Sequence, residues 1–248
     1  MTLNDLQNAI CRYKTPLALT LAPEIDRVEE KVKKNFREMF GEGPMADTEA
    51  LRYHGTAALD RAEGKLAAVV IEAGKYLPYG MMGMDVLYNL VSAAKAKSFY
   101  VILDCGAVDA RPWLSIGADG YTVSPYGGES ACRLGGDKTA FALVRTANAG
   151  GDLQNLRAGD RPLYAAVAEQ MARSGAALVV ETGYSLDVRE LRRRCEKAFL
   201  LLRHCDVENA LPAFDDYGHG ALVADDELQY GADVDQTIKN FRQWVNVI

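Results

Sequence analysis

The stretch Phe99–Arg111, FYVILDCGAVDAR, joins a short apolar run to two carboxylates. The run Phe99–Leu103 has no polar interruption, which is typical of a strand in a parallel sheet that is covered on both faces. Asp104 and Asp109 follow the run, five positions apart. Because the functional side chains of α/β barrels stand at the carboxyl ends of the strands, the stretch predicts a strand that ends at a catalytic rim.

Seven further apolar runs predict strands, and amphipathic segments lie between most of them. The runs are Leu17–Leu21, Ala67–Ile71, Gly120–Val123, Phe141–Val144, Ala177–Val180, Phe199–Leu202 and Ala221–Ala224. We expect helices over Thr48–Arg61, Met84–Ala96, Pro162–Ser174, Leu186–Lys197 and Val234–Val245. Eight strands with helices between them predict an α/β fold, a single (β/α)8 TIM barrel domain over residues 1–248. An open doubly wound sheet is the competing fold, but it seldom needs eight strands in so short a chain.

One connection is too short for a barrel helix with its two loops. Only 12 residues (122 − 109 − 1) separate Asp109 from Thr122, and Pro112 is among them. We therefore expect a shortened connection after the third strand, with either a vestigial third helix or a local distortion of the barrel.

The composition narrows the classes of function. With 49% apolar residues the chain can bury a large core, and a net charge of -6 argues against a nucleic-acid partner. The five cysteines are scattered without a C-x-x-C pair, which indicates reduced intracellular thiols rather than disulfides or a zinc site. The chain starts without a leader-like pattern and has no long apolar run, so we expect a cytoplasmic protein with no membrane partner. The glycine pairs match no nucleotide-loop motif, and no cofactor is expected.

If the chain is a barrel, its chemistry belongs to the residues that follow the strands. The expected rim consists of Thr20, Ala22, Glu72, Asp104, Gly106, Asp109, Ser124, Tyr126, Thr146, Asn148, Glu181, Thr182, Arg203, His204 and Asp225. Two histidines, His204 and His219, stand near aspartates, but their spacing fits no metal signature and favours a surface acidic loop. The triple arginine Arg192–Arg194 is interpreted as a solvated helix end.

Five motifs follow one another along the chain. They are KTPLALTLAP (Lys14–Pro23), YGMMGMDVL (Tyr79–Leu87), ILDCGAVDA (Ile102–Ala110), YTVSPYGGES (Tyr121–Ser130) and FALVRTANAGGDLQNL (Phe141–Leu156). In order and approximate spacing, and over essentially the whole chain, they resemble the orotidine 5'-phosphate decarboxylase family in its longer bacterial form. The resemblance implies a TIM barrel, a carboxy-lyase of pyrimidine (UMP) biosynthesis, a pyrimidine-like ligand and a homodimer.

The functional positions that the resemblance implies are only partly filled. In the family, lysines and aspartates alternate around the leaving carboxylate, and a lysine protonates the carbanion-like carbon. Asp104 and Asp109 occupy the two aspartate positions, but Gly106 stands at the central lysine position and Ile71 at the lysine position of the second strand. The aspartate that contacts the ribose is replaced by Ala22, and the serine that binds the pyrimidine by Ala147.

The phosphate site that the resemblance implies is also altered. The glycine-rich turn of the family is matched here by DDYGHG, Asp215–Gly220, and its arginine region by ADDEL, Ala224–Leu228. The carboxylates of Asp225, Asp226 and Glu227 would repel a phosphate dianion. We therefore expect a diverged member with little or no decarboxylase activity, in effect a pseudoenzyme.

The candidate site residues are Asp104 and Asp109 as catalytic groups, and Ser124, Tyr126, Thr146 and Asn148 as substrate-binding groups. Without a cation the two aspartates would repel each other, and one of them is expected to take up a proton at a raised pKa. Lys75 is a possible substitute for the missing lysine. Two alternatives stay open: a non-catalytic binding or regulatory barrel, and an enzyme with new chemistry that uses Asp104, Asp109 and Glu72 or Glu181. No metal is expected in any of these cases.

Overall fold

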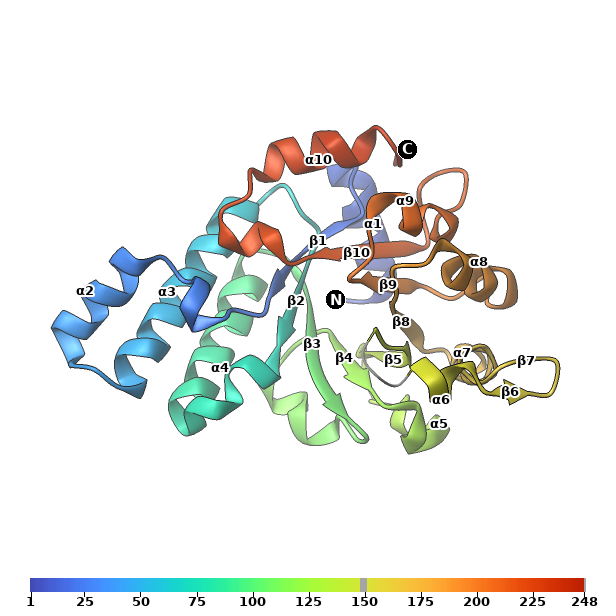
Figure 1. The fold of residues 1–248 in the computed structure, drawn as a ribbon, viewed down its shortest axis with the longest axis horizontal. Helices are drawn as coiled ribbons and strands as arrows, with labels where there is room; N and C mark the ends of the chain where they lie inside the picture. The colour runs from blue at the N-terminus through green and yellow to red at the C-terminus, as the bar shows by residue number, and fades with distance from the viewer. Residues whose placement is uncertain (148–150, 248) are drawn as a thin grey trace.

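The computed structural model describes residues 1–147 and 151–247, and within them eight parallel strands close into one barrel (Figure 1). The strands are β1 (Leu17–Leu21), β2 (Ala68–Glu72), β3 (Tyr100–Ala107), β4 (Gly120–Val123), β5 (Thr139–Arg145), β8 (Ala177–Glu181), β9 (Leu200–Arg203) and β10 (Ala221–Asp225). They are neighbours in this order, and β10 closes the ring by pairing with β1. The predicted TIM barrel is confirmed, and each predicted apolar run forms one of its strands. A small hairpin, β6 (Arg157–Ala158) and β7 (Arg161–Pro162), lies outside the barrel.

The five predicted helices are present with shifted ends. They are α3 (Pro44–Ala62), α4 (Gly80–Ala96), α7 (Leu163–Arg173), α8 (Ser185–Arg194) and α10 (Val234–Arg242). The sequence reasoning missed α1 (Leu3–Tyr13), α2 (Glu30–Phe40), and the short α5 (Gly128–Ala131), α6 (Gly151–Asn155) and α9 (Val207–Ala210). No helix in the described part of the chain is long and apolar enough to cross a lipid bilayer.

The connection between β3 and β4 is short, as predicted. A 3-10 helix, η4 (Arg111–Ile116), replaces an α-helix there, and Pro112 lies in its first turn. The barrel is irregular at the same place, because the register of β3 against β4 shifts between Leu103 and Ala107. β3 continues past this shift to Ala107, so Asp104 and Gly106 belong to its last four residues, at the carboxyl end of the barrel.

The side chains that enter the barrel are fixed by strand register. Paired residues on neighbouring strands share a face of the wall, and successive residues alternate between faces. Arg203 of β9 contacts Asp104 of β3, on the opposite side of the ring, so both side chains point inward. Glu72 is paired with Asp104 and Glu181 with Arg203, so these side chains also face the interior at its carboxyl end.

Candidate active site

One guanidinium and three carboxylates meet at the mouth of the barrel. The Arg203 side chain is only 5% exposed, and its Nη1 lies 2.5 Å from Asp104 Oδ2 and 3.2 Å from Glu181 Oε1. Its Nη2 contacts Glu72 Oε1. These carboxylates come from β3, β8 and β2, so a single cation ties together strands on different sides of the ring. Arg203, the last residue of β9, is therefore the cation of this cluster, and the sequence reasoning placed it at the rim without assigning it partners.

Asp104 is further held by β4. The Thr122 hydroxyl donates to Asp104 Oδ1 at 2.7 Å and accepts the backbone N–H groups of Cys105 and Gly106, each at 3.0 Å. Burial raises the pKa of Asp104 above its usual value, although the Thr122 hydrogen bond acts in the opposite direction. Burial also raises the pKa of Glu181, and the negative charge of Asp104 adds to that rise. Three carboxylates around one guanidinium leave excess negative charge in the mouth.

Asp109, the second predicted catalytic group, lies in different surroundings. Its side chain is 42% exposed and forms an ion pair of 2.7 Å with Arg111. The hydrogen bonds from Arg111 lower the pKa of Asp109. Burial, and not repulsion by Asp109, is therefore what raises the pKa of Asp104. The pair as catalytic groups remains a prediction, but the structure gives the two aspartates separate partners.

Three of the four predicted substrate-binding residues line one cavity of about 470 Å³. Ser124, Tyr126 and Thr146 share it with Gly106, and Asn148 lies outside the described residues. The rest of the lining is Pro125, Leu143, Val144, Leu153, Gln154, Leu163, Tyr164, Val167, Gln170 and Met171. Gly106 is two residues beyond Asp104 on β3, so the cavity reaches the carboxyl end of the strand that carries Asp104.

Ile71 and Gly106, which stand at the two lysine positions that the resemblance implies, have different surroundings. Ile71 was assigned to the second-strand lysine, but its side chain is fully buried on the outer face of β2, whereas that of the next residue, Glu72, points into the mouth. Gly106 has a φ of 56°, and a Cβ there would meet nothing within 4 Å. Lys75 forms an ion pair of 3.3 Å with Glu24 and lines a separate cavity of about 280 Å³ beside Glu72.

The segments matched to the phosphate site lie at opposite ends of the barrel. The turn Asp215–Gly220 precedes β10, and the carbonyl of Gly220 accepts the N–H of Leu200 at the start of β9. This turn is thus at the amino end, so its assignment to a ligand site in the mouth was wrong. The acidic segment that follows β10 does lie at the carboxyl end, where Asp226 is 3.5 Å from His204 and Glu227 is 2.9 Å from Arg27.

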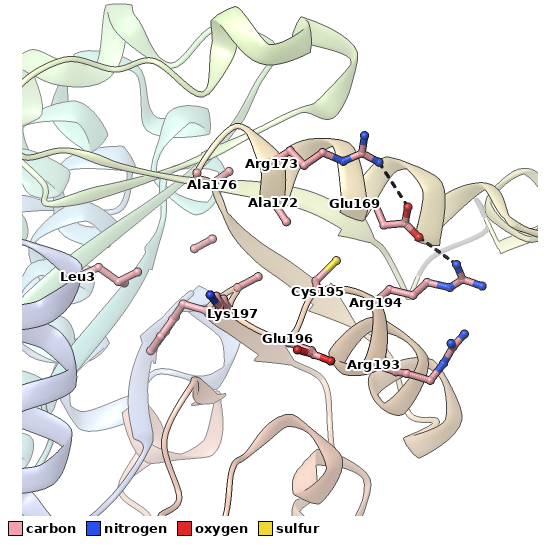
Figure 2. A pocket seen from close by; sticks show the side chains of 14 residues that line it. Leu3, Glu169, Ala172, Arg173, Ala176, Arg193, Arg194, Cys195, Glu196 and Lys197 are labelled. Atoms are coloured by element: carbon pink, nitrogen blue, oxygen red, sulfur yellow. Dashed lines mark hydrogen bonds and ion pairs between the residues drawn. The ribbon is translucent and has the colours of Figure 1, made fainter.

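A cavity of about 500 Å³ lies at the amino end of the barrel, between the ends of α7 and α8 (Figure 2). Figure 2 shows the Glu169 carboxylate between the guanidinium groups of Arg173 and Arg194, with distances of 3.5 and 3.0 Å. Cations near the last turns of two helices offset the negative ends of the helix dipoles. We do not assign a catalytic role to this cavity, because the chemistry of TIM barrels is built at the opposite end.

The two histidines that stand near aspartates, His204 and His219, lie at opposite ends of the barrel. His204 lies at the mouth, whereas Nε2 of His219 contacts Cys11 Sγ of α1 at 3.2 Å near the amino end. In the described part of the chain no group of three or more histidine, cysteine, aspartate or glutamate side chains is arranged to hold a metal ion.

Sequence reasoning placed Glu72, Glu181 and Arg203 at the rim and, in one alternative, grouped the glutamates with Asp104, but it did not connect Arg203 with them. The available signal was a charged residue at the end of each apolar strand, in VVIE, LVVE and LLLR. Because buried charges require partners, these three residues and Asp104 could have been grouped from the sequence.

The comparisons with known proteins agree with this architecture. No family model matches the chain. A curated orotidine 5'-phosphate decarboxylase from Caldicellulosiruptor saccharolyticus is 27% identical over 157 residues, which are 51% of this chain and only half of the relative's length. The structure of the Leishmania donovani OMP decarboxylase covers 98% of both chains with a TM-score of 0.80 and 23% identity. The Plasmodium berghei orotidine 5'-monophosphate decarboxylase has a TM-score of 0.81 at 15% identity and covers 97% of this chain and 96% of its own. Curated and structural neighbours thus point to the orotidine 5'-phosphate decarboxylase family.

Proposed function

We propose that this chain is a diverged homologue of orotidine 5'-phosphate decarboxylase, from the lineage of pyrimidine biosynthesis, with little or no decarboxylase activity. The observation that carries the proposal is the state of Arg203, the cation that contacts Asp104 in the barrel mouth. Arg203 is buried and already bound to Glu72, Asp104 and Glu181.

A bound guanidinium cannot replace the lysine that the resemblance implies. Decarboxylation leaves a carbanion-like carbon that must be protonated, and arginine does not give up its proton in proteins. The protonated form of Asp104 could donate a proton, and burial favours that form. A neutral carboxyl would nevertheless supply no positive charge. The loss of a preorganised electrostatic group costs about 10²–10³ in rate, and the loss of acid–base help costs about 10²–10⁴.

The test is an assay with orotidine 5'-monophosphate, followed by pyrimidine absorbance, on the wild type and on Asp104→Asn. An active orotidine 5'-phosphate decarboxylase is the positive control. We expect turnover at least about 10⁴-fold below the control, because the two losses above combine. We also expect the same result for both proteins. Ordinary turnover that Asp104→Asn abolishes would overturn the proposal, and Lys75→Met would then identify the substitute cation.

A second candidate function is an enzyme with carboxylate chemistry on another substrate. The raised pKa values of Asp104 and Glu181, which both contact Arg203 at the carboxyl end of the barrel, favour it. It predicts that any activity found in a substrate screen is lost in both Asp104→Asn and Glu181→Gln. A non-catalytic binding barrel predicts no such activity and a ligand affinity that tolerates both substitutions.

The proposal extends to a homodimer and to a cytoplasmic location. Apolar side chains exposed on α3 and α4 support the homodimer, since Met45 is 49%, Met81 90% and Tyr88 51% exposed.

A further inference from the structure

The cavity beside the mouth has the size of a small-molecule site. Its volume of about 470 Å³ falls within the range of about 300–1,000 Å³ that is usual for ligand pockets. Most of its wall is apolar, and two aromatic rings contribute to it. Tyr164 is buried in the wall, whereas Tyr126 is 78% exposed at the rim. Aromatic side chains of this kind pack against flat rings.

The described lining carries no charged side chain. Its polar groups are the amide or hydroxyl groups of Ser124, Thr146, Gln154 and Gln170, together with the two tyrosine hydroxyls. A phosphate dianion moved from water into such a wall would lose its hydration without gaining a cation. The lining therefore suits an uncharged molecule with a few hydrogen-bonding groups.

Arg145, the cation behind the cavity wall, already forms an ion pair with Asp187. Arg145, at the end of β5, is 9% exposed, and its Nε lies 3.1 Å from Asp187 Oδ2. The guanidinium lies over the Tyr164 ring, 4.7 Å from its centre, and Nη1 donates to Gln154 Oε1 at 3.2 Å. Arg145 thus fixes two residues of the wall, Tyr164 and Gln154, while Asp187 offsets its charge. Binding an anion here would require breaking this buried pair.

From the size of the cavity, its uncharged described lining and the pairing of Arg145 with Asp187, we propose that this cavity binds an uncharged aromatic molecule of one or two rings and discriminates against its phosphorylated form. The inference rests on the proposed function, because it assigns a class of ligand to a barrel that does not turn over the phosphorylated substrate. The two are tested separately, because the proposed function is judged by turnover and this inference by binding alone.

The test uses two probes that share one ring system, 2-naphthol and 2-naphthyl phosphate. Their affinities for the wild-type chain are measured by calorimetry at neutral pH. We expect 2-naphthol to bind at least about tenfold more tightly, a difference of about 1.4 kcal/mol. Val167→Phe fills part of the cavity from α7 and is expected to weaken 2-naphthol binding at least about fivefold. Leu186→Phe, at a position that is 72% exposed on α8, is the control and should leave the affinity unchanged.

A second variant tests the charge argument without filling the cavity. Gln170 is exposed at the rim on α7, so Gln170→Arg should fold and place a cation at the cavity. We expect this variant to bind 2-naphthyl phosphate at least about fivefold more tightly than the wild type does, with Gln170→Met as the matched control.

Three results would overturn the inference: no binding of 2-naphthol to the wild type, equal or tighter binding of 2-naphthyl phosphate, or 2-naphthol affinity unchanged in Val167→Phe. The orotidine 5'-monophosphate assay is independent of these probes. Turnover there would refute the proposed function, whereas silence there together with absent naphthol binding would refute the ligand class alone.

Discussion

At the scale of single residues, Arg203 compensates part of the charge of three carboxylates that the barrel brings together. Its removal in Arg203→Met would leave buried carboxylates without a partner. We expect a loss of about 3–5 kcal/mol in the free energy of unfolding, measured by urea denaturation at neutral pH. The loss should shrink in mild acid, because the carboxylates then take up protons. Arg111→Met removes an exposed arginine and serves as the control, with little change expected. Equal stabilities of the two variants would contradict the role of Arg203.

His54 predicts a pH dependence with a definite sign. Burial lowers the pKa of His54 from 6.5 to about 4, and the ring lies 5.3 Å from that of Tyr230. As the pH falls from 6.5 towards 4, the unfolded chain takes up a proton before the native state does. The native state is therefore destabilised over this interval, by at most about 3 kcal/mol before solvent screening is considered.

The corresponding variant is His54→Phe, which keeps an aromatic ring beside Tyr230. Between pH 6.5 and 4, the free energy of unfolding of this variant should fall less than that of the wild type. Above pH 7 the two proteins should show the same pH dependence. Urea denaturation across this range measures both. Parallel curves for the two proteins would show that His54 titrates normally.

The limits of prediction at this scale are visible in β2. A continuous apolar run predicts a buried strand, but it has no alternation from which to determine which residues face inward. The end of the strand was therefore predictable from the sequence, but the face of each residue was not. The side chain that points into the barrel is that of Glu72 and not that of Ile71. A shift of one residue exchanges the two faces of a strand.

At the scale of elements, Arg192 and Arg193 at the end of α8 have different partners: Arg192 bonds to backbone carbonyl groups, and Arg193 pairs with Glu190. The sequence reasoning took Arg192–Arg194 as a solvated group, which is wrong for Arg192. The Arg192 guanidinium donates to the carbonyl oxygens of Ala213, Glu196, Ala198 and Gly220 at 2.8–2.9 Å. It thus fastens the end of α8 to the turns that lead into β9 and β10.

We expect Arg192→Met to lower the free energy of unfolding by about 2–4 kcal/mol, since several buried carbonyl groups lose a charged donor. Arg193 is the matched control, because its side chain is 63% exposed and its pair is Glu190. Arg193→Met should change stability little. Thermal and urea denaturation of both variants measure the difference, and equal effects would refute this role of Arg192.

The helices differ in how far the sequence predicts them. Helices α3, α4, α7, α8 and α10 were predicted from their apolar periodicity, but α2 is mostly polar and was missed. In α2 the buried residue is Lys33, and the helix packs on α3 away from the strands (Figure 1). Val32 and Phe36, four positions apart on α2, pack against Ala50 and Leu51 of α3, so the helical spacing of these apolar residues was a signal that the sequence reasoning did not use.

At the scale of the whole molecule, the barrel was predictable and the mouth was not. The strands follow from local composition, whereas the contact of Arg203 with Glu72 joins positions 131 residues apart. That contact exists only because the ring closes. The sequence reasoning therefore placed Arg203 at the rim and offered Lys75 as a substitute cation, but it did not connect Arg203 with the carboxylates.

The last prediction concerns the exposed apolar surface on α3 and α4. Met81 and Tyr88 are seven positions apart on α4, and Met45, Met81 and Met82 line a shallow cavity together. Water contact with such a patch is unfavourable, and a second copy of the chain would remove it. We expect light scattering after gel filtration to give about twice the chain mass of 27.1 kDa, and Met81→Asp to give the monomer mass. Leu186→Asp, on exposed α8, should leave the dimer intact. A wild type that is monomeric at about 50 μM would exclude a stable homodimer through this surface.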